Sequence, residues 1–92
     1  MGLRFTWDRE KASRNLEKHG VSFEEAATVF GDPLSLTVGD TEHSDDEHRF
    51  VIVGHSFRDR LLVVVHLERD ESIRIVSARP ATGREKKTYE ET

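Results

Sequence analysis

The chain has 92 residues and no cysteine, which excludes a disulfide framework, thiolate chemistry and zinc–cysteine sites. This length fits one domain with a small core, and neither an 18-residue apolar run nor a signal peptide is apparent. We therefore expect a soluble, cytoplasmic protein. The formal net charge of −4 disfavours a broad, nonspecific nucleic-acid binder.

The charge is distributed unevenly along the chain. Residues 1–48 carry five Lys/Arg and eleven Asp/Glu, a net of −6, whereas residues 49–92 carry nine and seven, a net of +2. The C-terminal half can therefore offer a local cationic site, while the N-terminal half does not.

The N-terminal segment predicts a short strand followed by a helix. Residues 3–7 alternate apolar and polar side chains, as in a half-buried strand. Asp8 is a good N-cap for a helix to about Lys18, and Gly20 is the expected left-handed residue after it. The predicted buried stripe of this helix contains Ala12 and Leu16.

Three polar side chains recur at four-residue spacing on this helix and therefore share one side of it: Lys11, Asn15 and His19. Such a polar edge can reach over a sheet toward a substrate. It can equally be solvated or hold a loop in place. The sequence leaves both interpretations open.

A second helix is predicted from a capping box, with Ser22 as N-cap and Glu25 three residues later. It should run to about Phe30, where Gly31-Asp32-Pro33 stops it. Only two or three residues join the two helices. We therefore expect a helical hairpin that packs on one face of a sheet.

Residues 34–38 alternate as a half-buried strand, and an acidic segment follows. Residues 39–48 contain five acids and two histidines, which are suitable metal ligands. Their spacing fits neither a calcium loop nor a helical histidine pair. We interpret the segment as a solvated acidic loop and predict no metal site.

Three apolar runs between Arg49 and Arg79 are separated by short polar breaks, which predicts an antiparallel meander of three strands. The runs are Phe50–Val53, Leu61–Leu67 and Ile73–Val76. The middle run is the most apolar segment of the chain, so it should lie at the centre of the sheet.

The pairing within this meander determines which charges lie together. A three-residue turn through Arg69-Asp70-Glu71 places Leu67 opposite Ile73 on the face that packs against helices. It also places His66 directly across from Arg74 on the other face. Such a pair can bind phosphate and transfer protons, or belong to an ordinary solvated face. The predicted neighbours on this uncovered face are Leu62, Val64, Val76 and Ala78, an apolar patch typical of a protein interface.

A last, short helix is predicted from the capping box of Thr82 and Glu85 and should reach about Tyr89. Glu85 and Tyr89 are four residues apart and face the same way, next to Arg79 at the end of the preceding strand. Such a cluster can handle a phosphodiester. It can also be a salt-bridged terminal helix.

Motifs along nearly the whole chain resemble the BrnT toxins of bacterial type II toxin–antitoxin pairs. They read FxWDxxKAxxNxxKHGVSFEEA from residue 5, VFxDP at 29–33, DExR at 46–49, GxS at 54–56, RLLxVV at 60–65 and RIxSARxA at 74–81, with Glu85 and Tyr89 after them. The family usually has glycine between Ser56 and Arg60, where this chain has Phe57-Arg58-Asp59. Aspartate tolerates left-handed geometry, so we expect only a small change in turn shape.

The resemblance implies a RelE-like α+β fold of order β-α-α-β-β-β-β-α, with residues 1–92 as one domain. It implies a metal-independent endoribonuclease without cofactor, which cleaves RNA by 2′-hydroxyl attack and so inhibits translation and growth. It also implies a ribbon-helix-helix, BrnA-like antitoxin, through which alone the toxin would contact operator DNA. Two alternatives remain, a catalytically inactive antitoxin-binding module of the same fold and a small nucleic-acid-binding regulator.

The expected site residues follow from the chemistry of such cleavage, which needs a base, an acid and cations that hold the phosphate. Arginine suits the phosphate and histidine suits proton transfer. The catalytic candidates are Arg79, Arg74 and His66, then Arg60, Glu85 and Tyr89. The candidates for substrate binding are Lys11, His19, Trp7 and Arg84.

Overall fold

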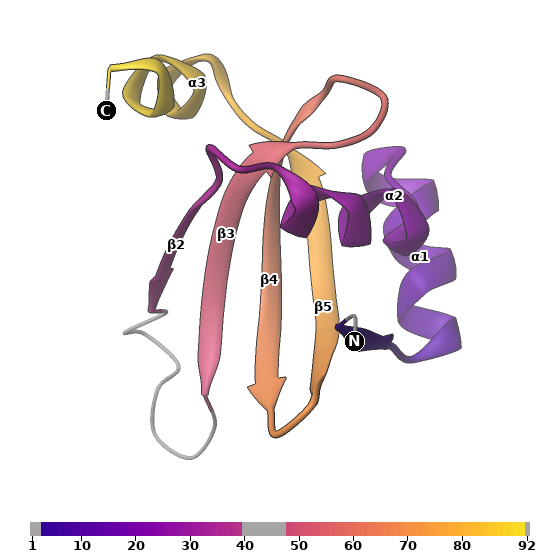
Figure 1. Cartoon of the computed structure of the whole chain (residues 1–92). Helices are drawn as coiled ribbons and strands as arrows, with labels where there is room; N and C mark the ends of the chain where they lie inside the picture. Colours follow the sequence, from indigo (N-terminus) through magenta and orange to yellow (C-terminus); the bar gives the residue numbers. More distant parts are fainter. Residues whose placement is uncertain (1–2, 40–47, 92) are drawn as a thin grey trace.

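The computed structural model of the chain describes residues 3–39 and 48–91 (Figure 1). The element order is β1 (Arg4–Thr6), α1 (Arg9–His19), α2 (Phe23–Thr28), the short 3-10 helix η1 (Val29–Gly31), β2 (Leu36–Gly39), β3 (Arg49–His55), β4 (Leu61–Arg69), β5 (Ser72–Pro80) and α3 (Gly83–Glu90). Most of the predicted acidic loop, residues 40–47, lies outside the described residues. Within the described ranges, no helix is long and apolar enough to span a membrane.

The helix boundaries follow local capping chemistry, as predicted. The Asp8 carboxylate accepts a hydrogen bond from the Lys11 amide at 3.0 Å, and Gly20 ends α1 with a φ of 70°. The capping box of Thr82 and Glu85 is present at the start of α3. The predicted buried stripe of α1 is wrong at Leu16, which is exposed, since α1 buries Asn15 instead.

The five strands form one mixed sheet in the order β1-β5-β4-β3-β2. All neighbouring strands are antiparallel except β1, which runs parallel to β5. The predicted meander is therefore confirmed, with β4 at the centre of the sheet. Because β4 has a strand on each side, it is the most continuously buried element of the chain.

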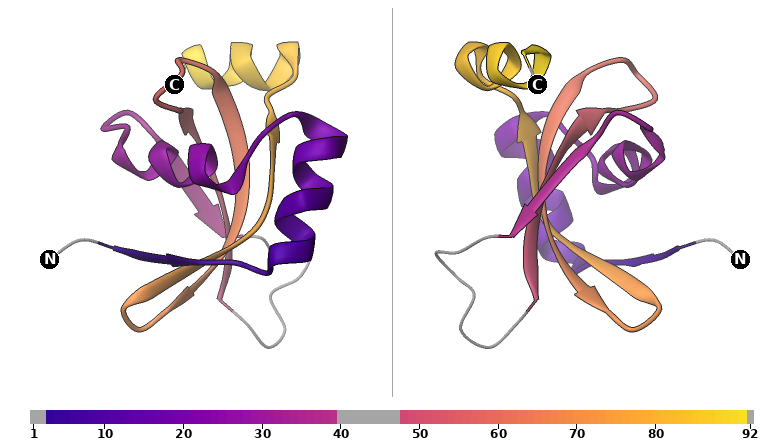
Figure 2. Two further views of the ribbon diagram at one scale, coloured as in Figure 1. Left: turned by 90° about the vertical axis from the view of Figure 1, so that its right-hand side faces the viewer. Right: turned by 60° about the vertical axis from the view of Figure 1, so that its left-hand side comes forward.

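The core lies between the sheet and the segment that contains α2 and η1. It contains Val21, Phe23, Ala26, Val29, Ile52, Leu62, Val64, Ile75 and Ala78. Both views in Figure 2 show α2 on one side of the sheet, whereas α1 lies beside the edge of β5, displaced toward the other side. The predicted helical hairpin on one face is therefore wrong, because α1 lies beside the β5 edge (Figure 2), where Ala12 packs against the rim of the core. We call the side of the sheet opposite α2 the open face; at its centre, Leu61, Val63 and Leu67 of β4 are buried.

The predicted three-residue turn is also wrong, because Arg69 pairs with Ser72 around a two-residue turn. Leu67 therefore lies opposite Arg74, and His66 lies opposite Ile75. A bulge beside Val65 inserts one extra residue in β5 and restores the alternation after it. With the two-residue turn and the bulge, β5 still presents its predicted apolar side chains to the helices. β4 is shifted by one residue, so the side chains that it presents to the helices are those predicted for the uncovered face.

The outer edge of β5 is sealed by a side chain of α1. β1 pairs only with residues 72–74 of β5, so the edge beyond them has no strand partner. The Asn15 amide donates to the carbonyl of Ala78 at 2.8 Å and to that of Val21 at 2.9 Å, and its oxygen accepts from the Ala78 amide at 3.1 Å. Asn15 therefore binds the backbone groups that a neighbouring strand would otherwise bind. Of the two interpretations that the sequence left open, the structural one applies to Asn15.

Candidate functional site

The open face concentrates positive charge. Side chains alternate along a strand, and paired residues share a face. Since Leu62, Val64 and Ile75 face α2, the residues between them face the open side. All five arginines within the described strands fall on this open face: Arg4, Arg49, Arg69, Arg74 and Arg79. The one acidic residue within these strands, Glu68, lies on the α2 side.

Two rows of paired residues show where these charges lie. Arg49 and Arg74 flank Leu67 across three strands, and Arg79 pairs with Val63 nearer to α3. A chain with a net charge of −4 thus presents a sheet face whose strand residues include cations and no acids. Such a surface attracts polyanions or acidic partners.

The Arg79 side chain is held by α3, the helix that follows its strand. Nη1 and Nη2 of Arg79 each donate to one oxygen of the Glu85 carboxylate at 2.8 Å. This ion pair and the capping bonds from Thr82 lower the pKa of Glu85 to about 2. Glu85 is therefore ionised at neutral pH and is a poor general base. It orients the guanidinium, whose Nε edge has no partner among the described residues.

A second polar cluster at the same end of the sheet joins Asp32, His55 and Tyr89. The carboxylate of Asp32 accepts from the His55 amide at 2.7 Å and from the Tyr89 hydroxyl at 3.3 Å, and it lies 3.6 Å from Nδ1 of His55. Hydrogen bonds from the His55 and Leu34 amides lower the pKa of Asp32. The His55 ring packs edge-on against Tyr89, and 41% of its side chain is exposed. No sequence pattern predicts Asp32 or His55 as site residues, since only the fold brings residues 32, 55 and 89 together.

α3 connects these two clusters. Its residue Glu85 contacts Arg79 of β5, and its residue Tyr89, one turn later, contacts His55 of β3. Both Arg79 and His55 belong to the open face, separated by β4. The end of the open face below α3 therefore combines an arginine, an exposed imidazole and a phenol.

Arg60 lies outside this arrangement. It forms an ion pair with the buried carboxylate of Glu25, to which its Nε donates at 2.9 Å, and it donates to the carbonyl of Gly20 at 3.0 Å. Glu25 also accepts from the Ser56 hydroxyl at 2.7 Å, and these bonds, led by that of Arg60, lower its pKa. The cluster ties α2 to the turn between β3 and β4. These bonds hold the Arg60 guanidinium on the α2 side, away from the open face.

The turn after Ser56 adopts the geometry that its sequence predicts. Asp59 has a φ of 60°, and it is the one non-glycine residue with positive φ in the described ranges. Its amide donates to the carbonyl of Ser56 at 2.8 Å. The aspartate therefore takes the left-handed position in place of the glycine that the resemblance led us to expect.

His66 does not lie beside Arg74, and this prediction is wrong. Its side chain is 0% exposed and lies on the α2 side, where its ring packs against those of Phe30 and Phe50. Burial lowers its pKa, although Nε2 lies 3.3 Å from the Glu68 carboxylate. A neutral, buried imidazole beneath the helices cannot reach a substrate on the open face. The predicted uncovered patch around it is wrong for the same reason, since Leu62, Val64 and Ala78 are core residues.

The remaining candidates lie around β5 and at the helix ends. Trp7 packs edge-on against Phe23 at 5.9 Å between ring centroids and is part of the core rim. Lys11 and His19 lie one turn before and after Asn15, so they follow the edge of β5 on the same side of α1. Arg84 is exposed on the first turn of α3.

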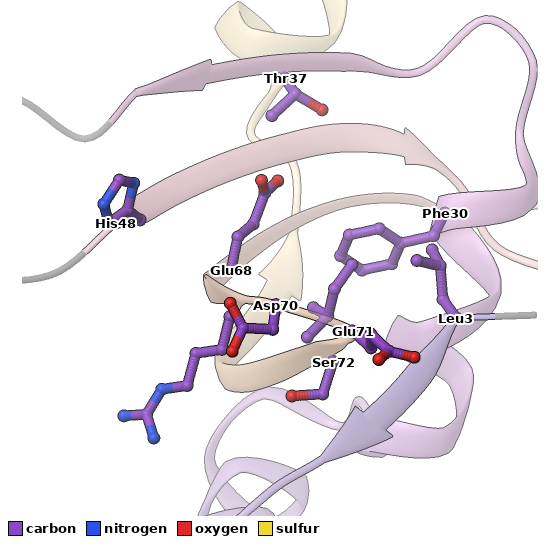
Figure 3. A pocket seen from close by; sticks show the side chains of 10 residues that line it. Leu3, Phe30, Thr37, His48, Glu68, Asp70, Glu71 and Ser72 are labelled. Atoms are coloured by element: carbon purple, nitrogen blue, oxygen red, sulfur yellow. The ribbon is translucent and has the colours of Figure 1, made fainter.

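A wide pocket lies at the opposite end of the sheet, next to the β4–β5 turn. It has a volume of about 820 Å³ and is lined by Leu3, Phe30, Thr37, His48, Glu68, Arg69, Asp70, Glu71, Ser72 and Ile73 (Figure 3). Three of these side chains are acidic, which makes the pocket unsuitable for a phosphate. Within the described ranges, no three His, Cys, Asp or Glu side chains form a group that can hold a metal ion.

Comparison with known proteins places these observations in a family. Residues 7–85 match the family model described as "Ribonuclease toxin, BrnT, of type II toxin-antitoxin system". No curated protein matches the chain. Among solved structures, the chain is similar to the 1.1 Å crystal structure of the Brucella abortus ribonuclease toxin BrnT, with a TM-score of 0.69 and 17% sequence identity over 88% of this chain and 99% of that one. The structural likeness shows a shared α+β fold.

Proposed function

Because the chain belongs to the BrnT family of ribonuclease toxins of type II toxin–antitoxin systems, we propose that it is an endoribonuclease whose RNA lies on the open face. The observation that carries this proposal is the charge of that face: five strand arginines and no strand acid, in a chain of net charge −4. Phosphate contacts dominate the affinity of nucleic-acid binding, and guanidinium groups provide them. The RelE-like assignment of the fold is part of this proposal.

Cleavage without metal requires the ribose 2′-hydroxyl to attack the neighbouring phosphorus. A base accepts the 2′ proton, the new 2′O–P bond forms, the P–O5′ bond breaks, and an acid protonates the departing 5′ oxygen. The products are a 2′,3′-cyclic phosphate and a 5′-hydroxyl. The protein must therefore supply a proton acceptor, a proton donor and a cation for the charged phosphorane.

We assign the phosphate to Arg79. Its Nη1–Nη2 edge is held by Glu85, which leaves the Nε edge to face a phosphate from the open side. A guanidinium fixed in this way loses little freedom when it binds, so its donors are preorganised for the transition state. Glu85 acts as a positioning residue. Arg74, on the same face nearer the β4–β5 turn, is assigned to a neighbouring phosphate of the RNA.

Proton transfer is assigned to His55 and His19, in place of His66. The His55 ring packs edge-on against Tyr89, and the Asp32 carboxylate lies 3.6 Å from its Nδ1. His19, at the end of α1, is the second candidate, and Lys11 and Arg84 remain candidates for binding the RNA backbone. Trp7 packs on Phe23, and its part in substrate binding stays a prediction.

A single-turnover assay tests the function and its chemistry. The purified chain should cleave a labelled single-stranded RNA and leave the same sequence with 2′-O-methyl riboses intact, because the nucleophile is blocked. The change of His55 to Ala should lower cleavage about 10²–10⁴-fold, the scale of general acid–base catalysis, with His19→Ala beside it to rank the two. Arg14→Ala is a matched control, since Arg14 pairs with Glu10 on the exposed side of α1. No cleavage by the unmodified, folded chain would favour the inactive antitoxin-binding module.

The expected role in the cell gives an independent readout. Expression of the chain alone should arrest growth with decay of RNA, and co-expression of the antitoxin should restore growth. The family implies an antitoxin partner. Its ribbon-helix-helix character and operator binding belong to this proposal.

A further inference from the structure

The open face has an apolar half, which the cleavage of RNA does not use. Two rows of paired residues cross the sheet from the edge strand β2. One contains Leu36, Val53 and Val63 and ends at Arg79, and the other contains Val38, Val51 and Val65 and ends at Ser77. We call Leu36, Val38, Val51, Val53 and Val65 the apolar strip.

The apolar strip is accessible, and its outer end is the most exposed. Val38 is 61% exposed and Leu36 is 38% exposed, while the neighbouring valines of β3 and β4 are half-buried. β2 is an edge strand whose residues 36–39 include no charged side chain and no proline. Natural sheets usually protect such an edge. In this chain the β5 edge is sealed by Asn15, whereas none of the described residues seals β2 in the same way.

We propose that the apolar strip binds a segment of the partner antitoxin that carries apolar side chains at one end and acidic side chains at the other. The apolar side chains pack on the strip, and the acidic ones reach Arg79 and Arg74. The inference rests on the proposed function in that the bound segment would cover the RNA site at the α3 end of the same face.

The distance across the sheet fits a short segment. The row from Leu36 to Arg79 spans four strands, or three interstrand spacings, which is about 14 Å. About four extended residues or about ten helical residues cover this length. A pocket of about 410 Å³ at the end of β2, lined by Leu34, Leu36 and Tyr89 among others, can take one apolar anchor side chain.

Charge and chemistry favour this occupant over two others. RNA gains little on the strip, because aliphatic side chains neither bind phosphates nor stack bases as aromatic rings do. A second copy of the chain would bring the same arginine-bearing face against the first, and the described strands offer no acid on that face to pair with these arginines. An acidic segment with apolar residues complements both halves of the face.

The test measures the binding of the antitoxin, purified from its complex with the chain, to variants of the full chain. Val38→Asp should weaken binding at least about 30-fold, which is about 2 kcal/mol, because it places a charge in a desolvated contact. Val38→Ile should bind like the unmodified chain. Leu16→Asp and Phe57→Asp change similarly exposed side chains, 51% and 73% exposed, on α1 and on the β3–β4 turn, and should leave binding unchanged.

Cleavage of RNA by the free variants separates this proposal from the proposed function. Val38→Asp should cleave RNA at the normal rate and resist inhibition by the antitoxin. The inference is overturned if Val38→Asp binds the antitoxin with normal affinity. It is also overturned if the control Leu16→Asp, and not Val38→Asp, weakens the binding. If Val38→Asp loses cleavage at an unchanged melting temperature, the apolar strip binds RNA. If the unmodified chain is a dimer and Val38→Asp is a monomer, the strip is a self-association surface. Either result also overturns the inference. If the chain cleaves no RNA at all, the proposed function fails while the binding measurement still decides the surface.

Discussion

Removal of the Arg79 guanidinium tests the proposed site most directly. Arg79 lies at the end of β5 on the open face, and its two terminal nitrogens are each 2.8 Å from the Glu85 carboxylate. If its Nε edge holds the phosphorane, Arg79→Ala removes one preorganised donor and should lower the single-turnover rate about 10²–10³-fold. Arg79→Lys should recover only part of this loss, because an ammonium keeps the charge but not the planar fork.

The same change should affect folding only modestly. The side chains of Arg79 and Glu85 are 39% and 36% exposed, so solvent screens their ion pair, and we expect its loss to lower the free energy of unfolding by about 1 kcal/mol or less. For a domain of this size that corresponds to a decrease in melting temperature of about 4–8 °C at most. Glu85 keeps its bonds with Thr82, so α3 should still begin at the same residue.

Cleavage rates and thermal melts of Arg79→Ala and Arg79→Lys should be measured together, with Arg14→Ala as the control arginine. An Arg79→Ala protein that cleaves RNA at the normal rate refutes the phosphate assignment. A variant that is largely unfolded at the assay temperature shows that the ion pair with Glu85 is the main role of Arg79. Glu85→Gln then gives the second arm: it keeps most of the capping geometry while it weakens the hold on the guanidinium, and a smaller loss of rate is expected.

Three further results are expected. Cleavage should persist in excess EDTA, and its abolition by the chelator with recovery by one divalent ion would contradict the metal-independent mechanism. The free energy of unfolding should fall below pH 6.5 by up to about 1.4 kcal/mol per pH unit, because the lowered pKa of buried His66 lets the unfolded chain bind the proton first, and His66→Phe should reduce this slope in denaturant melts. Asn15→Ala should destabilise the chain by roughly 2–4 kcal/mol in the same melts, since it leaves the buried amide and carbonyl of Ala78 without partners; a loss below about 0.5 kcal/mol would mean that water replaces the side chain.

The sequence by itself determined the features that depend on neighbouring residues. The helix ends are set by Asp8, Gly20 and Thr82 through contacts within three or four residues, so the roles of these residues can be predicted from the sequence. Asp59 took the left-handed turn position for the same reason. The meander and the central place of β4 followed from composition, because only a strand buried on both faces is apolar throughout.

Only the tertiary structure decided which face each side chain occupies. Because β4 is apolar on both faces, its sequence does not indicate which side chains face the helices. A two-residue turn followed by a bulge buries the apolar side chains of β5 as well as the predicted three-residue turn does. That choice put His66 in the core and gathered the strand arginines on the open face. Asp32, His55 and Tyr89 meet over 57 residues of chain, and Asn15 reaches Ala78 over 63, through packing that no local pattern encodes. The physical reason is that register and long-range contact are selected by the burial of the whole sheet, a property of the assembled core and not of any one segment.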